Sequence, residues 1–308
     1  MIDAFTTLLS SPMMQRSLLA ALIVGLTAPI IGTYLVHRRL AMLGDGIGHI
    51  SLTGVALGWL VGAFANVSPA DSWAIPGAVI VSLLGAITIE LVRQSGRTSG
   101  DTALAMLFYG GIAGGVLLIG LAGGTSAQLN SYLFGSISTV RWSDITLITI
   151  LGIAIVALGI GLAPALFSVT NDEDFARSTG LPVRTLSLLI AVLSALTVAV
   201  AMRVVGSLLV SALMVIPVAI AQLGARSFRS TMGIAMALGV VICMSGLSLT
   251  YFIDLSPGAT IVVGAIALYA ISFGIRAIVD RVRRVRRIRA ARGHNQHPEH
   301  EQTAHADA

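Results

Sequence analysis

The sequence predicts an all-α, polytopic integral membrane protein, and both its composition and the placement of its charges indicate this fold class. Hydrophobic residues make up 56% of the 308 residues, charged residues make up only 11%, and the mean hydropathy is +0.90. In soluble domains roughly a quarter of the residues are charged. The charges here lie in short connecting segments and near the C-terminus. Lipid must therefore be the solvent for most of the chain.

Apolar stretches long enough to cross a bilayer give the predicted helices. About 17–25 apolar residues span the hydrocarbon core, and this criterion predicts about nine transmembrane helices. They cover residues 14–36, 41–63, 73–92, 102–122, 144–167, 185–202, 204–223, 231–253 and 258–279. Only Arg203 separates the sixth stretch from the seventh. A re-entrant seventh stretch, with eight crossings in total, is therefore the alternative.

The arginines predict the orientation of these helices, because cytoplasmic loops carry an excess of basic residues. With the N-terminus outside, most loop arginines fall on the cytoplasmic side, namely Arg38, Arg39, Arg93, Arg97, Arg177, Arg184, Arg226 and Arg229. Only Arg16, Arg141 and Arg203 then lie outside. This alternation favours nine crossings, N-out and C-in.

The end of the chain differs from the rest in composition. Residues 1–279 form the predicted transmembrane domain, and residues 280–308 form a basic and then His-rich cytoplasmic tail that we expect to be disordered. Seven arginines between Arg281 and Arg292 follow the last apolar stretch directly. They indicate contact with anionic lipid of the bilayer rather than with nucleic acid.

The basic residues also exclude one catalytic activity. All nineteen of them are Arg, and no Lys occurs anywhere in the chain. A P-loop needs a Lys to reach the β- and γ-phosphates. The chain therefore cannot carry this nucleotide-hydrolysing site itself, and any ATP must be hydrolysed by a partner. The single Cys243 lies in an apolar stretch, so no disulfide framework is expected.

Two ionisable residues near the start of the second apolar stretch are candidate metal ligands. Asp45 and His49 are four residues apart, so in a helix they lie on one face. Ionisable groups inside a membrane are costly and usually line a polar pathway. A carboxylate with an imidazole and no thiolate suits zinc or manganese, and is compatible with iron. A hydrogen-bonded Asp–His pair that only joins two helices is the alternative.

Glycines leave one side of the same predicted helix almost bare. Gly44, Gly48, Gly54 and Gly58 recur along it, with Gly46 between the first two. Small residues at such spacing let helix backbones approach closely. We therefore predict that these glycines serve helix packing, against a neighbouring helix or a second copy of the chain, rather than ion binding.

A short polar helix is predicted in the loop after the fifth apolar stretch. Thr170 and Glu173 have the spacing of a capping box, and acidic residues occupy the first turn. Gly180 is expected to end the helix and Pro182 to prevent its continuation. The helix would project into the cytoplasm, and an ordinary solvated loop helix is the alternative.

The last sixteen residues contain closely spaced imidazoles. His294, His297, His300 and His305 lie beside acidic side chains in a segment too polar to fold. Neutral imidazoles can bind transition metals weakly, so the tail is a candidate cytoplasmic metal buffer or sensor. A solvated tail without a role is the alternative that the composition favours.

Taken in order, these motifs resemble the permease subunits of the bacterial ATP-binding-cassette importers for zinc, manganese and iron ions. The matching elements are Gly44, Asp45 and His49, then Gly54-Val55-Ala56-Leu57-Gly58, Leu133-Phe134-Gly135, the acidic to Leu-Pro element from Glu173 to Pro182, and the run from Val205 to Pro217. The resemblance covers roughly residues 14–279. Thr53 departs from it, because many relatives have proline at this position, where it would kink the helix.

The resemblance implies specific roles and partners. Asp45 and His49 would contact the passing cation, with no cofactor bound permanently. The helix containing Glu173, Asp174, Phe175, Ala176, Gly180 and Pro182 would dock on a cytoplasmic ATP-binding-cassette ATPase. Two permease subunits would pair around a central pathway in the bacterial cell membrane, and an extracytoplasmic metal-binding protein would deliver the ion.

Two other kinds of transporter are alternatives. A secondary carrier would be expected to have inverted repeats, and the sequence has no convincing repeat. A siderophore or cobalamin permease would be expected to have a wide, neutral pathway, and Asp45 with His49 argues against it.

Overall fold

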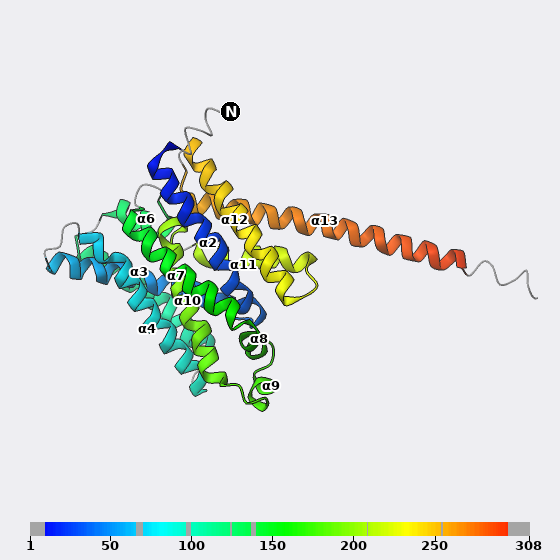
Figure 1. Cartoon of the computed structure of the whole chain (residues 1–308). Coiled ribbons are helices and arrows are strands. Elements are labelled where there is room, and N and C mark those ends of the chain that lie inside the picture. Colours follow the sequence, from blue (N-terminus) through cyan, green and yellow to red (C-terminus); the bar gives the residue numbers. More distant parts are fainter. Residues whose placement is uncertain are drawn as a thin grey trace, which may run out of the picture.

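The computed structural model describes residues 10–65, 70–96, 100–123, 125–136, 140–207, 209–253 and 255–294. These residues are almost all helical, and no strand occurs among them. Eight helices are long and apolar enough to cross a membrane (Figure 1). They are α2 (Pro12–His37), α3 (Ala41–Phe64), α4 (Ala74–Ser95), α5 (Gly100–Leu121), α7 (Trp142–Gly161), α10 (Val183–Val205), α12 (Phe228–Phe252) and α13 (Pro257–His294). The all-α polytopic prediction is confirmed.

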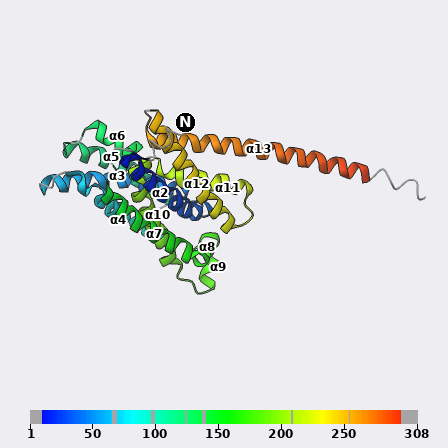
Figure 2. The same cartoon turned by 45° about the horizontal axis from the view of Figure 1, so that its top comes forward.

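The remaining helices are short. They are η1 (Ala70–Trp73), α6 (Ser126–Phe134), α8 (Ala163–Asn171), α9 (Glu173–Ser178) and α11 (Val210–Gly224). Helices α8 and α9 lie at the end of the bundle opposite the start of α2 (Figures 1 and 2). Nine full spans are therefore too many for the described chain, because the predicted stretch 204–223 becomes the 15-residue α11. A helix of that length covers about 22 Å, less than the roughly 30 Å of a bilayer core.

A glycine directly after α10 explains why the predicted stretch 204–223 does not form one continuous helix. Gly206 has φ +89°, a left-handed conformation that side chains with a Cβ rarely adopt. A Cβ added there would come within 2.5 Å of the backbone nitrogen of Gly135. The next residue, Ser207, donates its backbone N–H to the carbonyl of Tyr132 at 2.9 Å. The chain thus turns where it meets the end of α6, and α11 begins part-way through the bundle.

Helices α2 and α10 form the most buried part of the bundle. In α2, the buried Tyr34 hydroxyl donates a hydrogen bond to the carbonyl of Gly159 at 2.6 Å, which joins α2 to α7. Gly25 and Gly239 allow α2 and α12 to touch, since a Cβ at Gly25 would lie 2.8 Å from Val240 Cα. Close backbone approach at small residues is the usual way in which membrane helices associate.

Helix α3 packs between α4 and α5, and its glycines face neighbours in the same chain. A Cβ added at Gly54 would lie 2.8 Å from Ala78 Cα in α4, and one at Gly44 would lie 3.4 Å from Met214 Sδ in α11. The hydroxyl of Thr53 donates to the carbonyl of Gly111 in α5 at 2.7 Å. Helix α3 runs unbroken from Ala41 to Phe64, so the threonine brings no break here.

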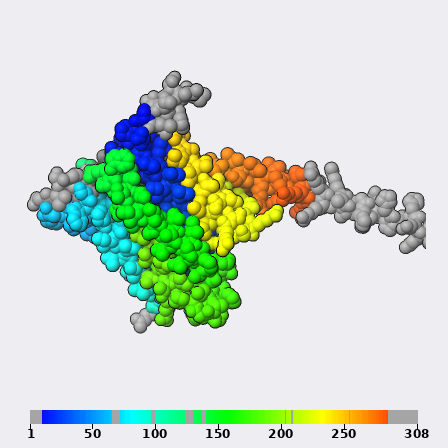
Figure 3. All heavy atoms as spheres, viewed as in Figure 1, coloured from blue at the N-terminus to red at the C-terminus, as the bar shows by residue number. Residues whose placement is uncertain are grey.

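Helix α13 leaves the bundle and extends away from it (Figures 1, 2 and 3). It is the least buried of the eight long helices, and large apolar side chains such as Ile271 and Phe273 are exposed on it. The helix continues to His294, whereas the sequence predicts disorder from residue 280. Arginine and alanine are good helix formers, which accounts for the extension. The tail residues His297, His300 and His305 lie outside the described residues.

Candidate cation site and loop helix

Asp45 and His49 lie one turn apart on α3, and the start of α11 reaches them from another part of the chain. His49 Nε2 lies 4.0 Å from Asp45 Oδ1. The same carboxylate oxygen accepts a hydrogen bond from the Ser211 hydroxyl at 3.0 Å. Ser211 belongs to the first turn of α11. The interruption after α10 therefore brings a serine hydroxyl and the N-terminal end of a short helix beside the candidate ligands, an arrangement known from other transporters.

His49 is buried with one ring nitrogen unpaired. Its residue exposure is 3%, and Nδ1 has no hydrogen-bond partner within the described chain. The ring contacts Phe108 of α5 edge to face, with a centroid distance of 4.1 Å. Buried polar atoms are nearly always hydrogen-bonded, so an orphaned ring nitrogen requires an explanation. A transient ligand, such as a water molecule or a cation, would satisfy it.

A cavity of about 370 Å³ adjoins Asp45 on the side of α5. Both Asp45 and Asp101 line it, together with Phe108 and the exposed Tyr109. Sequence reasoning missed Asp101, whose only signal is its position in the first turn of α5. Among the described residues, no three His, Cys, Asp or Glu side chains come together as a metal cluster. One copy of the chain thus offers two candidate ligands, Asp45 and His49, and a further carboxylate, Asp101, in the lining of the cavity.

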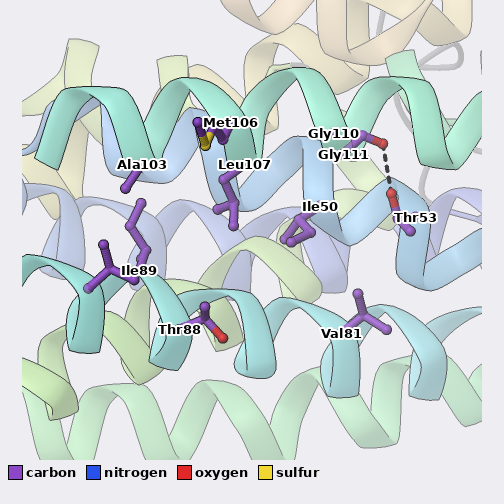
Figure 4. A pocket seen from close by; sticks show the side chains of 11 residues that line it. Ile50, Thr53, Val81, Thr88, Ile89, Ala103, Met106, Leu107, Gly110 and Gly111 are labelled. Carbon is purple, nitrogen blue, oxygen red and sulfur yellow. Dashed lines mark hydrogen bonds between the residues drawn. The ribbon is translucent and has the colours of Figure 1, made fainter. Parts of the chain in front are cut away.

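A larger cavity lies nearby, between α3, α4 and α5, but its chemistry is different. It measures about 530 Å³ and is lined by Ile50, Thr53, Val81, Thr88, Ile89, Val92, Ala103, Met106, Leu107, Gly110 and Gly111 (Figure 4). None of these side chains is charged. The hydroxyl of Thr53 is engaged by the carbonyl of Gly111. This cavity has hydroxyl groups but no ionisable side chain to balance the charge of a cation, so the candidate site remains at Asp45 and His49.

The loop helix predicted for 171–182 is present as α9, but a different residue caps it. The side chain of Asp172 accepts hydrogen bonds from the backbone N–H groups of Asp174 and Phe175 at 3.0 and 2.9 Å. The predicted capping box of Thr170 with Glu173 is wrong. The Thr170 hydroxyl donates instead to the carbonyl of Leu166 inside α8, at 2.6 Å. Because α8 runs up to this point, the cap falls two residues later.

The C-terminal end of α9 has the predicted glycine conformation. Gly180 has φ +83°, and Leu181 donates its backbone N–H to the carbonyl of Ala176 at 3.1 Å. Pro182 then precedes the first residue of α10. Ala176 is buried against the bundle, whereas Phe175 is 61% exposed. An aromatic side chain is thus presented on a helix that the bundle holds on its other side.

Glu173, the first residue of α9, is held by two arginines from other helices. It forms ion pairs with Arg38, just after α2, and with Arg93 near the end of α4. Burial disfavours the charged form of Glu173, but the hydrogen bonds and charges of Arg38 and Arg93 outweigh it and hold the pKa of this carboxyl below its usual value. The carboxylate is therefore charged at neutral pH. Sequence reasoning did not predict these pairings.

The chain is similar to curated and solved membrane transport proteins. It is 32% identical over 269 residues to the manganese transport system membrane protein MntC of Halalkalibacterium halodurans, covering 87% of this chain and 89% of that protein. It is 29% identical to the high-affinity zinc uptake system membrane protein ZnuB of Haemophilus influenzae, covering 83% and 95%. The solved structure of PsaBC from Streptococcus pneumoniae in complex with Fab has a TM-score of 0.78 at 31% identity, covering 89% and 95%. The profile of the ABC 3 transport family matches residues 10–276, and the chain therefore belongs to this family.

Proposed function

We propose that this chain is the membrane-spanning permease subunit of an ATP-driven importer that moves manganese or zinc into the cytoplasm. The observation that carries the proposal is the pair of Asp45 and His49 on α3, with Nε2 of the buried imidazole 4.0 Å from the Asp45 carboxylate and Nδ1 without a partner among the described groups. Ionisable groups inside a membrane-spanning helix are costly, and in a multi-pass protein of the cell membrane they usually line a polar pathway. The relatives named for manganese and for zinc transport support this choice of cargo.

Two ligand groups suit transport better than storage. A cation that must enter and leave needs binding that is weak enough for release, and it keeps some water or takes ligands from elsewhere. A carboxylate and an imidazole suit both manganese and zinc, and iron is compatible with the same ligands. The hydrogen bond from Ser211 holds Asp45 while no cation is bound. The cation would replace this bond as it arrives.

A second permease subunit would complete the pathway. The cavity beside Asp45 and Asp101 lies against a face of α3 and α5 where Met42 and Tyr109 are each 70% exposed. Lipid is a poor neighbour for carboxylates, so a second subunit covering this face would shield them. An extracytoplasmic metal-binding protein would deliver the ion, which would then pass between the carboxylates of the two subunits.

The energy would come from a separate ATPase subunit on the cytoplasmic side. The chain has no lysine and so no P-loop. Helix α9 is the candidate docking element, because it exposes Phe175 while Ala176 anchors it to the bundle. A cavity of about 540 Å³, lined by Arg177, Pro182 and the first residues of α10, adjoins this helix and offers a recess for a partner side chain.

Growth of a strain that lacks its own importer tests the proposal. The intact gene, expressed with its ATPase, should restore growth in manganese- or zinc-depleted medium and raise the cellular content of one of these metals. Asp45→Asn and His49→Ala should each abolish the gain at normal expression. Asp280→Asn, an exposed carboxylate on α13, is the matched control and should restore growth fully. Full uptake by both site variants would refute the site.

A further inference from the structure

A group of charged side chains joins the loop helix α9 to three long helices. Glu173 of α9 is paired with Arg38, whose side chain is only 6% exposed, and with Arg93, whose guanidinium lies 3.4 Å away. Arg93 also donates two hydrogen bonds, of 2.9 and 2.8 Å, to the buried carboxylate of Glu90 on the same helix. Two guanidinium groups thus face two carboxylates. The charges balance, as buried charges must.

The group also reaches the start of α10. Arg38 donates a hydrogen bond to the hydroxyl of Ser187 at 2.7 Å. The side-chain amide of Gln94 donates to Glu90 at 2.8 Å and to the carbonyl of Arg184 at 3.3 Å. Glu173 is therefore the only α9 side chain in this group within the described residues, and the other members lie at the ends of α2, α4 and α10. Movement of α9 would act on these ends first.

Two series of close helix–helix contacts connect these helix ends to the candidate cation site. Helix α4 packs on α3 beside the candidate site, where a Cβ added at Gly85 would lie 2.8 Å from Ile50 Cδ1, and Ile50 directly follows His49 on α3. Helix α2 packs on α11, where a Cβ added at Gly32 would lie 3.0 Å from Met214 Cα. Helix α11 carries Ser211, which binds Asp45. Helices in such close contact cannot move far without moving their neighbours.

We propose that Glu173, with Arg38 and Arg93, is the joint that transmits movement of α9 to the cation site. Movement of α9 would shift α4, and through it Asp45 and His49 on α3. It would also shift α2, and through α11 the Ser211 hydroxyl that binds Asp45. These three are positioning residues, since none lies at the site itself. The inference rests on the proposed docking of the ATPase on α9. It adds that docking and transmission use different side chains, the exposed Phe175 for the first and the ion-paired Glu173 for the second.

The ratio of metal transported to ATP hydrolysed tests the joint, because a merely structural role would not change it. The complete permease–ATPase complex is reconstituted in liposomes, and both rates are measured with manganese or zinc. Glu173→Gln keeps the size of the side chain and removes its charge. We expect the ATPase to remain bound and active while transport per ATP falls by about tenfold, a change within the range typical of coupled sites.

A second variant is used in case the Glu173→Gln protein is not produced in the membrane at a normal level. Arg93→Lys keeps the positive charge but loses the forked guanidinium that holds Glu90 and Glu173 together, so the ratio should also fall. Asp280→Asn on α13 is the control and should match the wild type. An unchanged ratio in the variants that accumulate overturns the joint, and so does loss of ATPase binding with Glu173→Gln. A wild-type chain that binds no ATPase refutes the proposed function instead.

Discussion

Replacing Gly180 by valine should weaken the docking of the ATPase without removing any contact seen in the chain. Gly180 ends α9 with φ +83°, and no atom lies within 4 Å of the position that a Cβ would take. A side chain there meets open space, so crowding contributes nothing. The entire effect comes from the left-handed backbone, which β-branched residues adopt poorly.

The expected size follows from this conformation. A left-handed residue with a Cβ costs roughly 1–2 kcal/mol, whereas asparagine tolerates the conformation better. One or two kcal/mol corresponds to a factor of roughly 5–30 in an equilibrium. The free loop can leave this strained conformation whereas docking requires it, so affinity for the ATPase should fall by about that factor with Gly180→Val, and by less with Gly180→Asn. Gly233→Val is the matched control, because Gly233 also faces open space but has no positive φ.

Titration of the purified permease with its ATPase measures this effect. The order of affinities should be wild type, then Gly180→Asn, then Gly180→Val, with the Gly233 variant equal to the wild type. Equal affinity and equal ATP hydrolysis for Gly180→Val would show that α9 is not the docking element. Equal losses for the asparagine and valine variants would refute the conformational explanation.

Three further predictions concern the cation site, the subunit contact and the tail. Ser211→Ala removes a hydrogen bond worth about 1 kcal/mol from the site carboxylate, so the apparent KM for the metal should fall by about fivefold, and a raised KM would contradict this. In a Cys243→Ala background, a cysteine at Tyr109 should crosslink two copies in membranes while one at Ile153, similarly exposed on α7, should not; crosslinking only at Ile153 would place the contact elsewhere. Truncation after Arg292 should leave uptake unchanged at low cytoplasmic metal, and relief of inhibition at high metal would indicate a sensing tail.

The long helices could be predicted from apolar length alone, because each must satisfy its backbone inside lipid. The interruption at Gly206 could not, since hydropathy does not report a left-handed backbone or the contact with Gly135. The chain there is as apolar as a span, which is why the stretch 204–223 was predicted to cross. The turn at Gly206, where the chain meets the end of α6, leaves α11 with 15 residues.

The candidate site was predicted only where its residues share one helix. Asp45 and His49 are one turn apart, so their spacing reveals their common face. Ser211 lies 166 residues away from Asp45, and a serine in an apolar stretch gives no signal of its own. The partners of Glu173 were missed for the same reason, because Arg38 and Arg93 indicate only a cytoplasmic loop until the fold brings them together.

ATP-driven metal uptake into liposomes that contain the complete complex tests the central claim most directly. The account predicts that manganese or zinc accumulates inside with the wild-type permease when ATP is supplied on the side of the ATPase. Asp45→Asn should remove this accumulation while ATP hydrolysis by the complex continues. Accumulation at the wild-type rate with Asp45→Asn would contradict the account, because the cation would then pass without the one carboxylate that His49 and Ser211 both face.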